Sequence, residues 1–377
     1  MSPDDLPLRD DLRGAQAYGA PQIDVPVRLN TNENSYPVPD EVVHAITGAV
    51  AAEAVSLNRY PDREHVALRE DLAAYLTRST GHPVGADQVW AGNGSNEVLQ
   101  HVALAFGGPG RTAMGFTPAY SMHPIISTGV GMRWVDGPRR DDFSLDADEV
   151  AAAVRAERPD VVLLCSPNNP TGTALDLALV ERVYDATDGV VVVDEAYAEF
   201  ARPGTPSAVT LLPGRERLVV SRTMSKAFAL AGARLGYLVA DEAVCTAMRL
   251  VRMPYHLSSV TQATARAALA HVDVLLGTVE AIKAQRDRVV EEVAGLGLRP
   301  VPSDANFVLF GGLDDEKATW TRLLDHGVLV RDVGIPGHLR VTAGTPDETT
   351  AFLEALAATL DRVPARPAPT STTTEHR

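Results

Sequence analysis

The sequence predicts an α/β protein with a mostly parallel, doubly wound sheet in a large domain, a smaller α+β domain and an N-terminal arm. Three observations support this fold class. Short apolar runs alternate with helical patterns in the first two thirds of the chain, and most runs are continuous, as in strands buried on both faces of a parallel sheet. The pattern changes beyond about residue 258, and the first 40 residues show little periodicity.

Six strands are expected in the large domain. They are QVWAG (88–92), RTAMGF (111–116), GMRWVD (131–136), DVVLLCS (160–166), GVVVVDEA (189–196) and RLVVSRT (217–223). Helical patterns such as NEVLQHVALAF (96–106) and LDADEVAAAVRA (145–156) lie between them, the second with acidic residues in its first turn. This alternation is typical of βαβ units.

The rest of the chain predicts a different layer. It contains one long helical segment (260–297), strand-like segments at 305–311, 327–333 and 338–344, and a helix over 347–363. The expected parts are an arm (1–40) packing on a partner subunit, a large domain (41–265), a small domain (266–364) and a disordered tail (365–377).

Composition excludes several classes of protein. The net charge of −15 argues against binding to nucleic acid or to an anionic membrane, and no apolar run of membrane-spanning length or signal peptide is present. The two cysteines, Cys165 and Cys245, predict no disulfide framework and a reducing, cytoplasmic compartment. Cys165 is expected to be a buried small residue rather than a nucleophile, and no metal-ligand cluster is found.

A glycine loop joins the first strand to its helix. Gly92-Asn-Gly-Ser-Asn-Glu97 is neither a Walker A loop nor GxGxxG, and Ser95 and Asn96 are expected to cap the helix. Free amides at a helix start can bind a phosphate, although the loop taken alone is better explained as a helix cap without any ligand.

Polar residues also follow two later strands. Asn168-Asn-Pro-Thr-Gly172 is explained by turn chemistry, but it lies where ligands bind in open α/β sheets. Asp194 ends a buried run of valines, with Tyr197 one turn on. Such a carboxylate is costly unless it is paired, so it is either a helix cap or the counter-charge of a cationic ligand atom.

Lysine is rare in this chain. Only Lys226, Lys283 and Lys317 occur among 34 lysines plus arginines, and only Lys226 stands among hydroxyl and apolar residues, near Thr223, Ser225 and Arg234. A desolvated lysine can form a Schiff base, whereas arginine cannot give up its proton. Hydroxyls, a guanidinium, a glycine loop, a buried acid and a reactive lysine together describe one ligand, pyridoxal phosphate.

The ordered motifs carry a resemblance over residues 10 to 360. They are LRGAQAYGAPQIDVPVRLNTNENSYPVP, NRYPD, AGNGSNEVL, SPNNPTG, VVDEAYAEF, RTMSKAFALAGARLGY, SDANFVLF and GHLRVTAGTPDET. The chain resembles the fold-type I pyridoxal-phosphate aminotransferases, and more closely the histidinol-phosphate aminotransferases. It departs from the usual NENPY at Ser35, which is expected to loosen that turn without removing a ligand.

The resemblance implies a role for each matching residue. Lys226 would be the Schiff-base lysine and the acid/base, Asp194 would pair with the pyridine nitrogen, and Tyr120 would stack on the ring. The remaining cofactor contacts would be Tyr197 and Asn169 at the ring oxygen; Gly94, Ser95, Asn96, Thr223, Ser225 and Arg234 at the phosphate; and Tyr60 from the partner of a homodimer.

The implied substrates are histidinol phosphate and 2-oxoglutarate, converted by a ping-pong mechanism to imidazole acetol phosphate and glutamate. Arg340 and Arg331 would bind the substrate's anionic group, and Tyr18 and Asn32 would contact the substrate; Arg331 could instead be a solvated charge at a strand end. The alternatives are an aromatic amino-acid aminotransferase, a phosphate-ester decarboxylase or other lyase, and a non-catalytic module that senses the cofactor.

Overall fold

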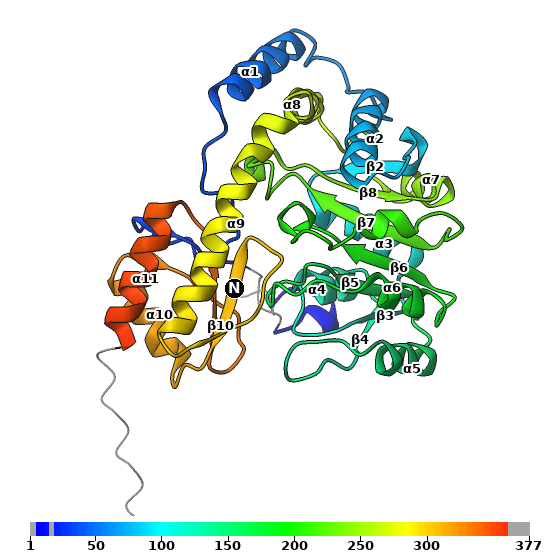
Figure 1. The fold of residues 1–377 in the computed structure, drawn as a ribbon. Coiled ribbons are helices and arrows are strands. Elements are labelled where there is room, and N and C mark those ends of the chain that lie inside the picture. The colour runs from blue at the N-terminus through cyan, green and yellow to red at the C-terminus, as the bar shows by residue number, and fades with distance from the viewer. Residues whose placement is uncertain (1–4, 15–18, 361–377) are drawn as a thin grey trace, which may run out of the picture.

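The computed structural model describes residues 5–14 and 19–360. Tyr18, the predicted tail and the end of the helix expected over 347–363 lie outside the described residues. Figure 1 shows the large sheet and its helices at the right and a smaller, helix-covered sheet at the left. The helix α9 (Val272–Gly295) runs from the end of α8 (Ser259–Ala270) down along the smaller sheet. The observed α/β architecture confirms the predicted fold class.

The large sheet has the strand order β2-β8-β7-β6-β5-β3-β4. Its strands are β2 (Val89–Gly92), β3 (Thr112–Gly115), β4 (Arg133–Asp136), β5 (Val161–Cys165), β6 (Val190–Asp194), β7 (Leu218–Thr223) and β8 (Gly236–Ala240). All six predicted strands are present, each shortened at one or both ends. The strands β4, β3, β5, β6 and β7 are parallel, and β8 runs antiparallel to both of its neighbours, β7 and β2. The sequence analysis missed β8, a five-residue run directly after a loop rich in special backbone conformations.

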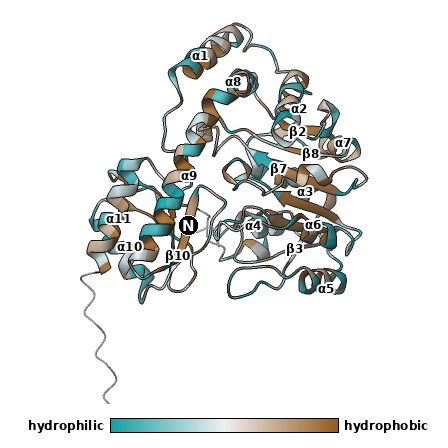
Figure 2. Ribbon diagram, viewed as in Figure 1, coloured by the Kyte–Doolittle hydropathy of each residue, from teal (hydrophilic) through white to brown (hydrophobic). Residues whose placement is uncertain are grey.

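Helices cover both faces of this sheet. They are α2 (Val66–Thr80), α3 (Ser95–Phe106), α4 (Met122–Gly129), α5 (Ala147–Glu157), α6 (Leu177–Tyr184) and α7 (Glu242–Val251). Farther from the sheet, α1 (Asp40–Ala54) packs on α8. Successive residues of β6 enter different core clusters: Val191 and Val193 pack in one, Val190 and Val192 in the other. This double burial explains the uninterrupted valines, which appear as brown strands in Figure 2.

The second part is a four-stranded antiparallel sheet with the order β12-β13-β10-β9. Its elements are α9, β9 (Arg299–Pro300), β10 (Phe307–Gly311), α10 (Glu316–Asp325), β11 (Val328–Leu329), β12 (Arg331–Asp332), β13 (His338–Thr342) and α11 (Pro346–Leu360). The N-terminal arm joins this part through β1 (Val27–Arg28), which pairs in parallel with β11. This pairing places the arm beside the strands of the second part. The domain boundaries given above stay predictions.

Two sequence expectations for this part were wrong. The single helix expected over 260–297 is divided at His271, whose backbone leaves the helical region and whose imidazole contacts Glu41. The single strand expected over 327–333 is two short strands in different sheets, because the Val330 carbonyl between them accepts a hydrogen bond from the Trp320 indole at 2.8 Å. Within residues 5–14 and 19–360, no helix is long and apolar enough to cross a membrane.

Candidate active site

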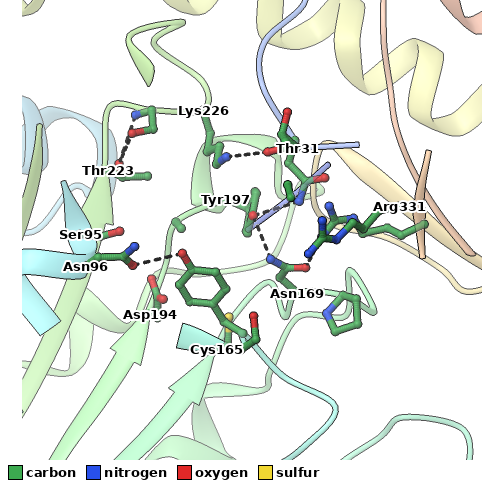
Figure 3. Close-up of a pocket in the computed structure, with 18 of the residues that line it drawn as sticks. Thr31, Ser95, Asn96, Cys165, Asn169, Asp194, Tyr197, Thr223, Lys226 and Arg331 are labelled. Atoms are coloured by element: carbon green, nitrogen blue, oxygen red, sulfur yellow. Dashed lines mark hydrogen bonds between the residues drawn. The ribbon is translucent and has the colours of Figure 1, made fainter. Parts of the chain in front are cut away.

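A cavity of about 740 Å³ opens where the carboxyl ends of the large sheet meet the arm and the small sheet. Figure 3 shows Tyr197 in its middle, Ser95, Asn96 and Asp194 at one side, Arg331 at the other and Lys226 above. Among the predicted site residues, those that line it are Asn32, Ser95, Asn96, Tyr120, Asn169, Asp194, Tyr197, Thr223, Ser225, Lys226, Arg234, Arg331 and Arg340. The fold therefore gathers residues that are far apart in the chain.

Asp194 lies in the floor of the cavity with 1% of its surface exposed. One carboxylate oxygen accepts a hydrogen bond from the Ser221 hydroxyl at 3.1 Å, and the other lies 3.2 Å from Nε2 of His123. Ser221 is its register partner on β7. The helix-cap interpretation of Asp194 was wrong, because its oxygens bond these two side chains and the next helical turn begins only at Ala198. Sequence reasoning missed His123, whose only signal was its position three residues after Tyr120.

The amine of Lys226 points into the cavity and donates a hydrogen bond to the Thr31 carbonyl of the arm at 3.0 Å. Burial, together with the nearby positive charge of Arg340, lowers the pKa of Lys226 to about 8. A larger fraction of the amine is therefore neutral near pH 7 than for an ordinary lysine. A neutral amine is the form that can attack a carbonyl carbon.

Tyr197 holds its hydroxyl beside two amides. The oxygen accepts hydrogen bonds from Nδ2 of Asn32 at 3.0 Å and from Nδ2 of Asn169 at 3.3 Å. Burial raises the pKa of Tyr197 above its ordinary value, so the hydroxyl keeps its proton at neutral pH and can donate it. Asn32 has a left-handed backbone (φ 56°) and also accepts from the Thr342 hydroxyl, so its side chain is used to bind residues of the protein itself.

The glycine loop places the start of α3 beside the cavity. Gly94, with φ 87°, is the N-cap residue, and Ser95 is the first helical residue; among the described residues no side chain caps this end. The predicted capping by Ser95 and Asn96 was therefore wrong. Instead Glu97 reaches back, and its carboxylate accepts from the backbone amide and the side chain of Asn93 at 2.6 and 2.9 Å. The first amides of α3 stay available to a ligand.

Hydroxyls and a guanidinium complete this polar corner. The Thr223 hydroxyl donates to the Ser225 hydroxyl at 3.0 Å, and Arg234 donates to the same oxygen at 3.4 Å. A Cβ at Gly94 would lie 2.5 Å from an Nη atom of Arg234, so only glycine lets this guanidinium approach the loop. Asn96 accepts a hydrogen bond from the Tyr120 hydroxyl at 3.1 Å. The corner is rich in donors, as an anion site requires.

Two arginines form the opposite side of the cavity. Arg331 on β12 and Arg340 on β13 are direct cross-strand partners. Arg340 donates to the Asn169 side chain at 2.5 Å and to the Asn30 carbonyl at 2.7 Å. Like charges directly opposite each other destabilise a sheet unless an anion lies between them. The pair is thus a second candidate anion site, separate from the corner at Ser95.

Two of the predicted site residues that the structure describes, Gly94 and Tyr60, do not line this cavity. Tyr60 is 79% exposed and stacks on Tyr255, with ring centroids 4.3 Å apart. Tyr18 lies outside the described residues. Cys165 does line the cavity, and its predicted burial is confirmed; burial raises the pKa of its thiol, which keeps it protonated at neutral pH. It therefore has the properties of a packing residue rather than a nucleophile.

Comparison with known proteins assigns the chain to a family. Residues 24–356 match the family model for aminotransferase class I and II. The chain is 62% identical over 361 residues to the histidinol-phosphate aminotransferase of Paenarthrobacter aurescens, covering 95% of this chain and 96% of that protein. It is 61% identical to the one from Frankia casuarinae, covering 95% of this chain and 91% of that protein.

Solved structures agree with this assignment. The histidinol-phosphate aminotransferase from Sinorhizobium meliloti, in complex with pyridoxal-5′-phosphate, is similar with a TM-score of 0.83 at 26% identity, covering 94% of this chain and 98% of that chain. A Thermus thermophilus aspartate aminotransferase mutant gives a TM-score of 0.79 at 25% identity, covering 93% and 99%. Fold and site thus define a fold-type I aminotransferase of class I and II. Within that class, the chain belongs to the histidinol-phosphate aminotransferase family.

Proposed function

We propose that this chain is a pyridoxal-phosphate-dependent enzyme that transfers the amino group of L-histidinol phosphate to 2-oxoglutarate. The products are imidazole acetol phosphate and L-glutamate, and the reaction belongs to histidine biosynthesis. The observation that carries the proposal is the pairing of Arg331 with Arg340 across the cavity from the donor-rich corner at Ser95. One anion site would hold the cofactor's phosphate and the other the substrate's.

The residues of this chain fit the cofactor. The first amides of α3, the hydroxyls of Thr223 and Ser225, and the Arg234 guanidinium would hold its phosphate, with Gly94 allowing the close approach. Tyr120 would stack on the ring, and Tyr197 and Asn169 would donate to its oxygen. The buried Asp194 carboxylate would keep the ring nitrogen protonated. When bound, the cofactor supplies an electron sink for the electrons left by the broken substrate C–H bond.

Lys226 would carry the covalent link and then the proton. Its lowered pKa leaves a larger fraction of the amine neutral than in an ordinary lysine, so this side chain would hold the cofactor covalently and would accept the proton from the substrate carbon. The Thr31 carbonyl holds the amine in the cavity through one hydrogen bond. A positioned acid–base group of this kind contributes about 10²–10⁴ in rate.

The arginine pair would select the substrate. A phosphate dianion is matched by two guanidinium groups better than by one, and histidinol phosphate has no carboxylate to compete for them. The two carboxylates of glutamate could use the same pair in the second half-reaction. This role for Arg331, in place of a solvated strand-end charge, is favoured by its position directly opposite Arg340.

The proposal includes a cytoplasmic homodimer with shared active sites. Tyr60 is exposed, held by the Tyr255 ring and outside the lining of its own cavity, which suits a hydroxyl that serves the partner's phosphate site. Tyr18 and Asn32 would contact the substrate, Tyr18 from the partner's arm. Both cysteines are free and buried, which fits a reducing compartment.

Steady-state kinetics test the proposal. Purified enzyme would be assayed with 2-oxoglutarate and a panel of amino donors, with the highest kcat/KM expected for histidinol phosphate. A higher kcat/KM for phenylalanine would overturn the substrate assignment in favour of an aromatic aminotransferase. Carbon dioxide release without amino transfer would indicate a lyase, and a bound cofactor that responds to no amine would indicate a sensing module.

A further inference from the structure

Four aromatic side chains pack together beside the glycine loop, outside the lining of the active-site cavity. Trp90 on β2 stacks on His256, with ring centroids 5.4 Å apart and planes 11° apart. His65 and His101 pack edge-on against the His256 ring at 5.7 and 5.4 Å. Trp90, His65 and His101 are at most 4% exposed. We refer to Trp90, His65, His101 and His256 as the histidine cluster.

His256 binds the chain on both sides of Gly92. Its Nε2 lies 2.9 Å from the Ala91 carbonyl, and because a carbonyl can only accept, this nitrogen carries the proton and donates it. Its own carbonyl accepts from Nδ2 of Asn93 at 2.8 Å. One residue from a distant segment therefore fixes the backbone before the glycine and the side chain after it. The ring stack with Trp90 fixes the orientation of the imidazole.

The loop depends on these contacts because its helix end lacks a side-chain cap among the described residues. Gly94 donates to the Gly92 carbonyl at 2.8 Å, and Asn93 is bound by Glu97 on one side and by His256 on the other. These bonds set the direction in which the amides at Ser95 and Asn96 point. A ligand site of this kind is only as accurate as the residues that support it.

We infer that His256 is a positioning residue for the phosphate of the cofactor, acting through Ala91 and Asn93 on the glycine loop. This inference rests on the proposed function, in which the first amides of α3 receive that phosphate. His256 does not line the cavity, so it acts without touching the ligand. His256 therefore affects how tightly the cofactor's phosphate is bound, and not how the aldehyde or the ring is bound.

A matched pair of substitutions isolates the Nε2 contact. In His256→Gln the side-chain amide reaches as far as Nε2 and can still donate to the Ala91 carbonyl. In His256→Asn the side chain is one methylene shorter, so its amide no longer reaches the Ala91 carbonyl. Both variants lose the stack on Trp90 equally, so a difference between them reports the hydrogen bond alone.

The measurement is the ratio of two dissociation constants. The full-length chain, freed of cofactor, would be titrated with pyridoxal phosphate and with pyridoxal, which lacks the phosphate. We expect His256→Asn to reduce the preference for the phosphorylated form about 3- to 10-fold, the size of one neutral hydrogen bond, with pyridoxal affinity unchanged. His256→Gln should stay within about 2-fold of the unsubstituted chain.

Each other outcome has a defined meaning. Equal ratios in the two variants, or an unchanged ratio in both, would overturn the inference and leave the proposed function standing. An unsubstituted chain with no preference for the phosphorylated form would remove the proposed phosphate site itself, and the inference with it. If His256→Asn does not fold, Asn93→Ala replaces it, because it removes the other contact of His256; an unchanged ratio there would also overturn the inference.

His338→Ala is the control, because asparagine could still place a donor where Nδ1 of His338 lies. The His338 imidazole also contacts a backbone carbonyl, that of Pro336 at 2.8 Å, but on β13, far along the chain from the glycine loop. Its ratio should equal that of the unsubstituted chain. A reduced ratio in this control would overturn the inference, because the loss would then follow from any broken imidazole contact.

Discussion

The end of β6 carries two buried acidic residues, Asp194 and Glu195, whose charges are matched in opposite ways. Asp194 faces the cavity and is held by Ser221 and His123. Glu195, the next residue, faces the other side of the sheet and accepts from Nε and Nη2 of Arg222 at 3.1 and 2.8 Å. Because side chains alternate along a strand, one step in sequence separates the two environments.

The far side of the sheet satisfies its own charges. Arg222 is 3.5 Å from a second carboxylate, Glu199, whose oxygen also accepts from the Tyr75 hydroxyl at 3.0 Å. Asp194, by contrast, pairs with no lysine or arginine in the part of the chain that the structure describes. A buried carboxylate without a cationic partner is costly. This difference between Asp194 and Glu195 indicates that the active site lies where a buried charge has no partner within the protein and can be matched by a ligand.

The largest effect is expected on the cavity side, from Lys226→Ala. Turnover should fall by at least about 10²–10⁴-fold, because no other amine can move the proton, while the melting temperature stays near that of the unsubstituted enzyme. The measurement is kcat with histidinol phosphate together with thermal unfolding. Lys283→Ala, which removes an ion pair with Glu280 outside the cavity, is the control and should leave kcat unchanged. Normal turnover in Lys226→Ala would refute the assignment of this residue.

Arg222→Ala is expected to lower the stability of the fold, in contrast to Lys226→Ala, which lowers turnover. Removing the guanidinium leaves Glu195 and Glu199 buried together, which should lower the free energy of unfolding by about 3–5 kcal/mol. Urea denaturation measures this. Arg78→Ala, which breaks an exposed pair with Asp273, should cost under about 1 kcal/mol. A similarly small loss at Arg222 would mean that the far side does not depend on its ion pairs.

The contrast also shows how much of the fold and of the active site could be predicted from the sequence. The strand ends and the ordered motifs predicted the fold class, and the structure brings the expected residues Asp194, Tyr197 and Lys226 to one cavity. His123 and Ser221 were not predicted, because a partner that only supports another side chain has no spacing rule of its own. The capping role predicted for Ser95 was wrong for a related reason. A Ser-Asn start predicts a cap, but contacts from Glu97 and from the distant His256 fix the loop instead.

Arg331→Ala tests the opposite side of the cavity. Unlike Arg222, Arg331 has no carboxylate partner among the described ion pairs, so its charge is available to a ligand. We expect kcat/KM for histidinol phosphate to fall about 10- to 100-fold, the size of a charge-assisted hydrogen bond, and to fall less for phenylalanine. Arg299→Ala, at the opposite edge of the same sheet, is the control and should change neither value. Equal losses for both substrates would make Arg331 a general structural residue.

The buried histidines can be compared in the same way, by the charged groups that lie beside them. His123 lies against the Asp194 carboxylate, whereas His65 and His101 in the histidine cluster face the guanidinium groups of Arg252 and, for His65, Arg69. Burial, with those charges and that of His256, lowers the pKa of His65 to about 3 and of His101 to about 4; Asp62 and Glu97 oppose the shift only in part. Both rings therefore stay neutral in the folded chain well below their ordinary pKa.

Acid should accordingly destabilise the fold through this cluster. As pH falls below about 6.5, the unfolded chain binds protons that the folded chain does not, so each ring removes up to about 1.4 kcal/mol per pH unit until its folded pKa is reached. His101→Asn keeps an acceptor for the Trp90 indole, which donates to Nδ1 of His101 at 3.2 Å, but cannot bind the proton. Urea unfolding between pH 6 and pH 4.5 should show a slope shallower by about one proton in this variant. His44→Asn, at an exposed position on α1, should keep the full slope. An identical slope in His101→Asn would mean that the His101 ring takes up its proton in the folded chain as it does in the unfolded one.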